Sequence, residues 1–520
     1  MKQQSPIFFR PEWTCGRYNE PNKAAIMYNL IEGQSYFFEE HSASVIGEIL
    51  SVPRNNPIAP SIIEGNTGIH IDSIIEFMEE LLNIGLVVVK SYSKEEIREL
   101  KKQIASAQYI DENKESDELM EYDTTNAEQA YSDVTYTPNS ISTVMLELTY
   151  NCSEKCIHCY NAGAARNDNE ANLRPRSEMN LNDYKRVIDE LYDLGLYKVC
   201  LTGGDPFSKP IVWEIISYLY EKNIAFDIYT NGQSITHKID QLLEYYPRFI
   251  GLSIYSAIDE VHDKITRIKD SLKKTLYVAE QLSTYAVPMS FKCVILKTNV
   301  KSYYTVSDLA ERYGAIAQFE VNLCNSVDGD ISVVNNLRLP VEALEVVLRD
   351  KRIPLYVGEE LPNYGGYPKE LTAHPCRAGM GTFNITPDGE LTPCCTFPTS
   401  FGNVVNTPLP EIISQSIELK QWQKVKISDI ESCAKEDKCA FCMLCAGNSF
   451  IEYGTPLKPS SLNCFMAEVR YNIAQKLKQG NDPLNGLTVE ERLTQISIED
   501  IEHFNRIETI NYRNHKLALK

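Results

Sequence analysis

The placement of the cysteines limits what this chain can fold into more strongly than any other feature of its sequence. Fifteen of the 520 residues are cysteines. Eleven of them lie in two groups, which are Cys152, Cys156 and Cys159, and the eight cysteines between Cys376 and Cys464. The start of the chain is too polar and too interrupted by proline for a signal peptide, so we expect a cytoplasmic protein, in which disulfides are rare. The grouped cysteines therefore predict metal or iron–sulfur sites.

The rest of the composition is typical of an ordinary globular protein. Hydrophobic residues make up 43% of the chain and charged residues 23%. The formal net charge of −20 argues against a protein that coats nucleic acid, because such a protein needs basic residues to displace counterions from phosphates. No run approaches the roughly 18 apolar residues of a membrane-spanning helix, so we expect neither nucleic acid nor a membrane as a partner. The four scattered cysteines are interpreted as small core residues: Cys15, Cys200, Cys293 and Cys324.

Strand-like and helix-like segments alternate between residues 142 and 325. The six strand candidates are TVMLELT, YKVCLTG, IAFDIYT, FIGLSIY, MSFKCVIL and AQFEVNL. This alternation predicts an α/β fold with a parallel sheet, and a partial (β/α)6 barrel similar to a TIM barrel is the leading interpretation. The first cysteine group follows the first strand and Gly203 follows the second, so both are expected on the rim formed by the C-terminal strand ends, where such folds carry their chemistry.

Five segments are expected along the chain. Residues 1–92 predict a winged-helix-like α+β domain, with strands KAAIMYNL and QSYFFEE around Glu32-Gly33, helices over 42–50 and IHIDSIIEFMEELLNIG, and a closing strand LVVVK. Residues 93–140 hold a charged helix over 93–108 and then an acidic stretch, 111–133, with nine acids and one lysine, which we interpret as a mobile linker. The barrel (141–335), a cysteine-rich domain (336–470) and a helical tail (471–520) follow.

The first cysteine group lies in the segment NCSEKCIHCYN, with C-x3-C-x2-C spacing. Three thiolates on one loop can hold three irons of a cubic [4Fe–4S] cluster and leave the fourth iron open to a substrate or cofactor. A zinc site made by the three cysteines with His158 is the alternative. The second strand ends in Thr202-Gly203-Gly204-Asp205-Pro206, whose glycines allow a ligand to approach the backbone closely.

The combination of this loop with the glycine turn resembles the radical S-adenosylmethionine (SAM) family, over roughly residues 142–325. The resemblance implies that the three loop cysteines carry a [4Fe–4S] cluster whose open iron binds the amino and carboxylate groups of SAM. It implies reductive cleavage of SAM to a 5′-deoxyadenosyl radical, with electrons from a donor of the flavodoxin or ferredoxin type. Asp205 stands where many relatives have Glu. By position, the implied SAM contacts are His158, Gly203, Gly204, Asp205, Ser253 and Arg267.

The downstream cysteines resemble the SPASM extension of radical SAM enzymes, which binds two auxiliary [4Fe–4S] clusters, so the resemblance implies three clusters in all. The ligands implied for auxiliary cluster I are Cys376, Cys394 and Cys445, with Cys395 as a candidate fourth ligand or an open fourth position. The ligands implied for auxiliary cluster II are Cys433, Cys439, Cys442 and Cys464. The spacing departs from the commoner pattern, because Glu436 stands where a second cysteine is usual. A structural zinc on Cys439 and Cys442 is the alternative.

The first domain resembles the peptide-recognition element of enzymes that modify ribosomally made peptides, which implies a precursor peptide whose leader adds a strand to an exposed sheet edge. The alternative is a winged-helix domain that only packs on the barrel. Together the resemblances imply a radical SAM/SPASM peptide maturase that installs a thioether or carbon–carbon cross-link. The alternative hypotheses are an enzyme that oxidises or epimerises a residue of a protein or peptide, and a zinc-binding adaptor without catalytic activity. Sulfatase-maturating relatives carry an Asp directly after the cysteine that matches Cys394, where this chain has Cys395.

Overall fold

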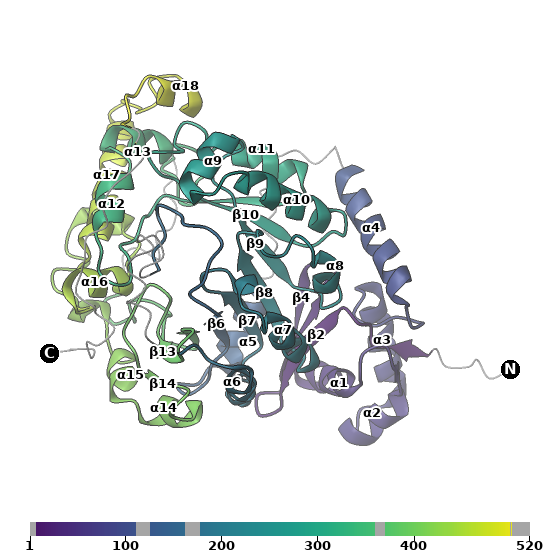
Figure 1. Ribbon diagram of the computed structural model, residues 1–520. Coiled ribbons are helices and arrows are strands. Elements are labelled where there is room, and N and C mark those ends of the chain that lie inside the picture. Colours follow the sequence, from purple (N-terminus) through teal and green to yellow (C-terminus); the bar gives the residue numbers. More distant parts are fainter. Residues whose placement is uncertain (1–6, 111–124, 162–176, 359–369, 500, 502–520) are drawn as a thin grey trace.

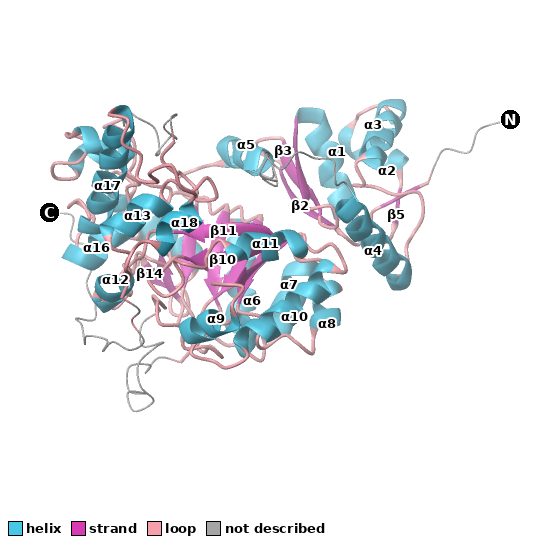
Figure 2. Cartoon of the chain, turned by 90° about the horizontal axis from the view of Figure 1, so that it is seen from above, coloured by secondary structure: helices cyan, strands magenta, loops and turns pink. Residues whose placement is uncertain are grey.

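The computed structural model describes residues 7–110, 125–161, 177–358, 370–499 and 501. An N-terminal α+β unit, a central sheet flanked by helices and a cysteine-rich region follow one another along the chain (Figure 1). The N-terminal unit and the cysteine-rich region lie on opposite flanks of the central sheet, as the view from above also shows (Figure 2). None of the helices in the described ranges is long and apolar enough to cross a membrane.

Six parallel strands form the central sheet, in the same order as in the sequence. They are β6 (Thr143–Glu147), β7 (Lys198–Thr202), β8 (Ala225–Thr230), β9 (Phe249–Ser253), β10 (Met289–Val294) and β11 (Ile316–Glu320). Each coincides with one of the six predicted segments. The predicted α/β class and the partial barrel of six β/α units are therefore confirmed.

Helices between the strands cover the outer side of this sheet (Figure 1). They are α6 (Leu181–Asp193), α7 (Val212–Glu221), α8 (Ile239–Leu243), α9 (Asp259–Thr266), α10 (Ser271–Ser283) and α11 (Thr305–Arg312). Helix α6 shows why these segments are helical: Asn180 and Asp183 form a capping box, and Tyr184, Val187 and Leu191 are buried at helical spacing. Burying each of these large side chains contributes roughly 1.5–3 kcal/mol, which fixes the helix on the sheet.

The cysteine-rich region continues the barrel sheet, a feature that the sequence analysis did not predict. Strand β12 (Thr382–Ile385) pairs in parallel with β6, and β13 (Glu390–Thr392) and β14 (Gly402–Asn403) follow in antiparallel order. The helices from the end of the barrel onward are α12 (Ser332–Leu337), α13 (Val341–Val347), α14 (Leu409–Gln415), α15 (Ile417–Trp422), α16 (Ala446–Tyr453), α17 (Ser461–Lys478) and α18 (Val489–Thr494). One hydrophobic core joins the barrel to these elements.

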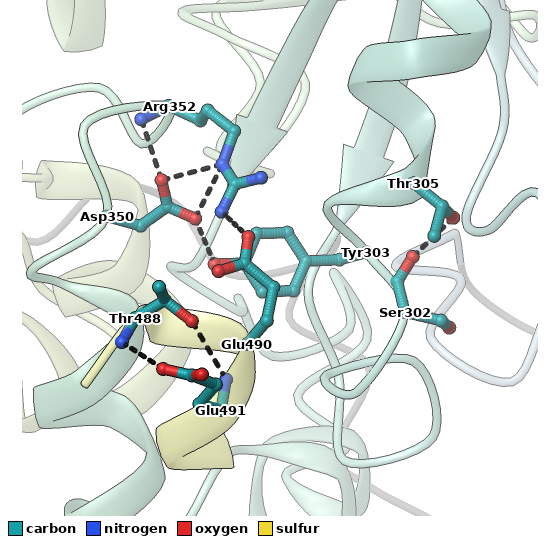
Figure 3. A network of polar contacts seen from close by, with 8 residues as sticks. All are labelled: Ser302, Tyr303, Thr305, Asp350, Arg352, Thr488, Glu490 and Glu491. Carbon is teal, nitrogen blue, oxygen red and sulfur yellow. Dashed lines mark hydrogen bonds and ion pairs between the residues drawn. The ribbon is translucent and has the colours of Figure 1, made fainter. Parts of the chain in front are cut away.

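Polar contacts anchor the described part of the C-terminal tail to the barrel (Figure 3). Glu490, at the start of α18, pairs with Arg352, and Arg352 Nε lies 2.8 Å from the Asp350 carboxylate. The same carboxylate accepts a hydrogen bond from the Tyr303 hydroxyl, which comes from the segment after β10. A capping box between Thr488 and Glu491 begins the helix. Residues 502–520 of the predicted helical tail lie outside the described residues.

The N-terminal unit is a three-stranded antiparallel sheet with three helices on one face. Its elements are β1 (Phe8–Phe9), β2 (Thr14–Asn19), β3 (Ala24–Asn29), β4 (Gln34–Glu39), α1 (Glu40–Ser51), β5 (Pro57–Ile58), α2 (Pro60–Thr67) and α3 (Ile71–Asn83). The predicted strand pair around Gly33 and both predicted helices are present. The predicted closing strand LVVVK is wrong, because Val88 makes only an isolated bridge to Phe9. Strand β2 went unpredicted because its sequence, TCGRYN, is largely polar.

Two helices, α4 (Lys94–Ile110) and α5 (Thr125–Thr135), connect this unit to the barrel. The linker predicted over 111–133 is therefore wrong over the α5 residues, while residues 111–124 lie outside the described part. Helix α5 packs on β3 and β4, and Glu128 in it accepts a hydrogen bond from the Tyr28 hydroxyl at 3.0 Å. Glu128 also pairs with Lys198 and, at 3.6 Å, with Arg248. The charge of Glu128 is thus compensated by two cations of the barrel.

The N-terminal unit docks on the end of the barrel where the strands begin. The backbone amide of Gly16 donates to the carbonyl oxygen of Asn223 at 3.1 Å, and Arg17 donates to that of Leu196. Asn223 and Leu196 lie just before β8 and β7. The cysteine loop follows the other end of β6, so the barrel strands lie between the N-terminal unit and the cysteine loop.

Candidate functional site

The first cysteine group forms a loop directly after β6, at the C-terminal rim of the barrel. Two backbone hydrogen bonds of 3.0 Å hold it to the end of α9, from Lys155 N to Thr266 O and from Ile157 N to Ile265 O. The three thiols lie near one another. Burial, Glu154 and the charges of Cys159 and Cys152 all raise the pKa of the Cys156 thiol well above its usual range. The predicted ligand set is therefore brought together on one loop.

Glu154, within this loop, is a residue that the sequence analysis missed. It is 5% exposed, and its carboxylate accepts hydrogen bonds from the Ser271 hydroxyl at 2.5 Å and from the Cys156 thiol at 3.5 Å. Burial raises the pKa of Glu154 to about 7. Ser271 also contacts His262 Nε2 at 3.3 Å, so this chain of contacts fixes the loop against α9 and α10.

The glycine turn after β7 packs against the backbone that leads into the cysteine loop. Gly203 has a φ of +133°, which favours glycine. The Gly204 amide donates to Thr149 O at 2.7 Å, and the Asp205 amide donates to Asn151 O at 2.9 Å. A Cβ atom on Gly204 would lie 2.2 Å from Asn151 O. The two glycines are therefore needed for contact between turn and loop, whatever ligand also approaches them.

The other predicted SAM contacts lie around the same rim. Asp205 is fully buried, and its carboxylate accepts hydrogen bonds from Thr230 and Ser208. The His158 ring meets the Tyr255 ring edge to face, with 4.8 Å between the centroids. The remaining two are Ser253, which ends β9 and contacts the Tyr255 hydroxyl, and Arg267, which is exposed directly after α9 with a φ of +58°. Their contacts with SAM stay predictions.

The three thiols predicted for auxiliary cluster I converge from different elements. The pKa of Cys376 is raised by burial and then by the charges of Cys445 and Cys394. Cys445 caps the N-terminus of α16, where its sulfur accepts from the Asn448 amide at 3.5 Å. Cys395, the candidate fourth ligand, hydrogen-bonds Cys394 and lies beside Glu147 at the end of β6.

The four thiols predicted for auxiliary cluster II line one cavity. They are Cys433, Cys439, Cys442 and Cys464. Within the described ranges, no group of three or more His, Cys, Asp or Glu side chains is close enough together to hold a single metal ion. Cysteine thiolates are the usual protein ligands of iron–sulfur clusters, so these donor sets fit such clusters.

A pocket lies between the barrel rim and the β12–β13 hairpin. Three carboxylates line it, those of Glu147, Asp388 and Glu390. Asn161, two residues after the last loop cysteine, lies on its barrel side, and Cys395 lies on its hairpin side. The pocket thus joins both cysteine regions.

Comparisons with known proteins agree with this geometry. The profile of the radical SAM superfamily matches residues 146–306. The profile of SPASM, described as an iron-sulfur cluster-binding domain, matches residues 376–445. The chain carries a radical SAM domain and a SPASM domain. The two resemblances are therefore confirmed, and with them the binding of SAM and of iron–sulfur clusters.

Three curated relatives are similar to more than half of this chain. The antilisterial bacteriocin subtilosin biosynthesis protein AlbA of Bacillus subtilis (strain 168) is 27% identical over 308 residues, which are 58% of this chain and 65% of AlbA, just under two thirds. The AdoMet-dependent heme synthase of Methanosarcina barkeri is 25% identical over 334 residues, which cover 59% of this chain and 91% of the synthase. The PqqA peptide cyclase of Methylobacterium sp. (strain 4-46) is 26% identical over 318 residues, which cover 57% of this chain and 79% of the cyclase.

Proposed function

We propose that this radical SAM/SPASM protein is a peptide maturase that installs an oxidative cross-link, a thioether or carbon–carbon bond, in a ribosomally synthesised precursor peptide. The observation that carries the proposal is the pocket between Asn161 and Cys395, because a residue bound there reaches both the radical SAM loop and the SPASM region. The names of two relatives, the subtilosin biosynthesis protein and the PqqA peptide cyclase, support a peptide as the substrate.

The cofactors and this chain's residues divide the work. When bound, SAM at the loop cluster supplies a 5′-deoxyadenosyl radical, and the SPASM clusters supply an acceptor for the electron released as the new bond forms. The Glu147 carboxylate is 4% exposed and lines the pocket. There it is placed to take the proton from the peptide group that forms the new bond with the substrate radical. Cross-linking thus removes two hydrogens in all, one as an atom and one as a proton and an electron.

The N-terminal unit would bind the leader along the edge of β4. Among the described strands, β4 pairs with β3 alone, so no described strand occupies its other edge, where a leader could add one. Phe38 on β4 and Phe77 on α3 meet edge to face, with centroids 5.9 Å apart, and both are only partly buried. Since the unit docks at the far end of the barrel, the peptide must span strands of about 17–20 Å before it reaches the rim.

Cys395 favours epimerisation as a second candidate. The Cys395 thiol and the Glu147 carboxylate both line the pocket. A thiol in the pocket can return a hydrogen atom to a substrate radical, and one electron from an external donor with one proton from water then restores the thiol. The peptide then keeps its mass.

Anaerobic co-expression with the short peptide encoded nearest the gene tests the proposal. Cross-linking predicts a loss of about two hydrogens that disappears in the Cys152→Ala variant. Epimerisation predicts an unchanged mass in ordinary water and uptake of one deuterium in heavy water. A peptide that changes in neither experiment, although the enzyme binds it and cleaves SAM, contradicts both candidates.

A further inference from the structure

Cys324 does not lie in the core, where the sequence analysis placed it. Cys15 and Cys293 are 1% exposed, as expected, whereas Cys200, within β7, and Cys324 are only partly buried. It follows the end of β11 by four residues, on the same rim as the cysteine loop. The segment after it is held there by two hydrogen bonds of 2.9 Å to the carbonyl oxygen of Tyr160, from the Ser326 hydroxyl and the Val327 amide.

This position brings Cys324 to the SPASM thiols. Val327, three residues further on, lines the pocket that Cys395 also lines, so the rim loop and the SPASM hairpin are in contact range. Burial, and the neighbouring charges of Cys445 and Cys394, raise the pKa of Cys324 to about 12. The same two thiols flank Cys376. Cys324 and Cys376 thus both lie close enough to Cys394 and Cys445 for the charges of those two thiols to act on them.

We propose that Cys324 is the fourth protein ligand of auxiliary cluster I, together with Cys376, Cys394 and Cys445. A cubic [4Fe–4S] cluster takes one thiolate per iron, and Cys324 supplies the one that the SPASM segment lacks. Its proton is released when the sulfur binds iron, as for any coordinating thiol. Cys395 is left to face the pocket with Glu147.

Two consequences follow from this coordination. Auxiliary cluster I has no open iron, so a substrate thiolate does not bind to it and the cluster serves electron transfer alone. The cluster also ties the last barrel strand to the SPASM region. The inference rests on the iron–sulfur clusters of the proposed function and not on which bond the enzyme forms.

Iron content and spectroscopy test the ligand directly. In a background with Cys152, Cys156 and Cys159 replaced by Ala, the two auxiliary clusters account for about eight irons and eight sulfides. Adding Cys324→Ala should either lower the iron content toward four or change the electron paramagnetic resonance signal of one reduced cluster. Cys324→Ser, which keeps an oxygen ligand and the side-chain size, should retain the irons with a shifted signal. Cys395→Ala and Cys293→Ala serve as matched controls and should leave both measurements unchanged.

The outcomes separate the possible failures. If Cys324→Ala keeps both iron and signal while Cys395→Ala changes them, Cys395 is the ligand and the inference is wrong. If neither changes them, the cluster has an open iron, and the inference is again wrong. Alkylation of the unsubstituted protein gives a second measurement, because Cys324 should react only after the clusters are removed, and equal labelling before and after would overturn the proposal. A parent protein with neither iron nor sulfide would instead contradict the proposed function.

Discussion

Replacing Gly204 by alanine is expected to displace the cysteine loop and to abolish most SAM cleavage. The new Cβ would lie 2.2 Å from the Asn151 carbonyl oxygen, 2.6 Å from its carbon and 2.8 Å from the carbonyl oxygen of Tyr150. These are backbone atoms, which cannot swing away as a side chain does, so loop and turn must separate by about 1 Å to restore an ordinary contact.

The cost of this separation follows from the contacts that it breaks. Overpacking of this kind costs roughly 1–3 kcal/mol. The hydrogen bonds from Gly204 N to Thr149 O and from Asp205 N to Asn151 O contribute about 1 kcal/mol each and would lengthen. We therefore expect a loss of about 2–5 kcal/mol in the free energy of unfolding. Because Asn151 directly precedes Cys152, a 1 Å shift should lower the rate of SAM cleavage by about 100-fold.

Gly65→Ala is the matched control. Gly65 lies inside α2, and a Cβ atom there would have no heavy atom within 4 Å. Alanine in a helix should stabilise the protein by up to about 1 kcal/mol and leave the rate unchanged. The two variants are compared by urea unfolding and by 5′-deoxyadenosine formation after anaerobic purification. Wild-type rate and stability in Gly204→Ala would refute the argument that the turn positions the loop.

Three further predictions concern single side chains. Glu128→Gln should lower the free energy of unfolding by about 3 kcal/mol, because it leaves Lys198 without its partner. Glu99→Gln, which removes one member of an exposed pair, should change this free energy by less than about 0.5 kcal/mol. Equal effects of the two substitutions in urea unfolding would refute the role of Glu128. Burial lowers the pKa of Lys101 to about 7 from 10.5, so between these values the unfolded chain holds a proton that the folded protein has released, and stability should rise with pH. Lys101→Met should remove up to roughly 4 kcal/mol of this rise between pH 7 and 10, and an unchanged pH profile would contradict it. Phe77→Ala should weaken binding of the precursor peptide, measured by calorimetry, about tenfold or more without changing SAM cleavage; unchanged affinity would argue against a leader site beside α3.

The sequence by itself determined those features that depend on residues close together in the chain. The six barrel strands were visible because parallel strands with both faces covered are short apolar runs bounded by turns. The loop of Cys152, Cys156 and Cys159 was visible because its ligands share one segment, and the glycine turn because it directly ends a predicted strand. The radical SAM and SPASM domains followed from these local patterns.

Only the tertiary structure decided features whose partners are far apart in the sequence. The acidic residues of α5 resemble a linker until Glu128 meets Lys198 and Arg248, since those cations come from the barrel. Strand β12 is too short and polar to be predicted, and its pairing with β6 spans more than 200 residues. Cys324 has the apolar neighbours of a core cysteine, and only the closure of the barrel rim against the SPASM region brings it to Cys394 and Cys445. Local patterns reveal the chemistry of a segment, whereas long-range packing determines which groups share a site.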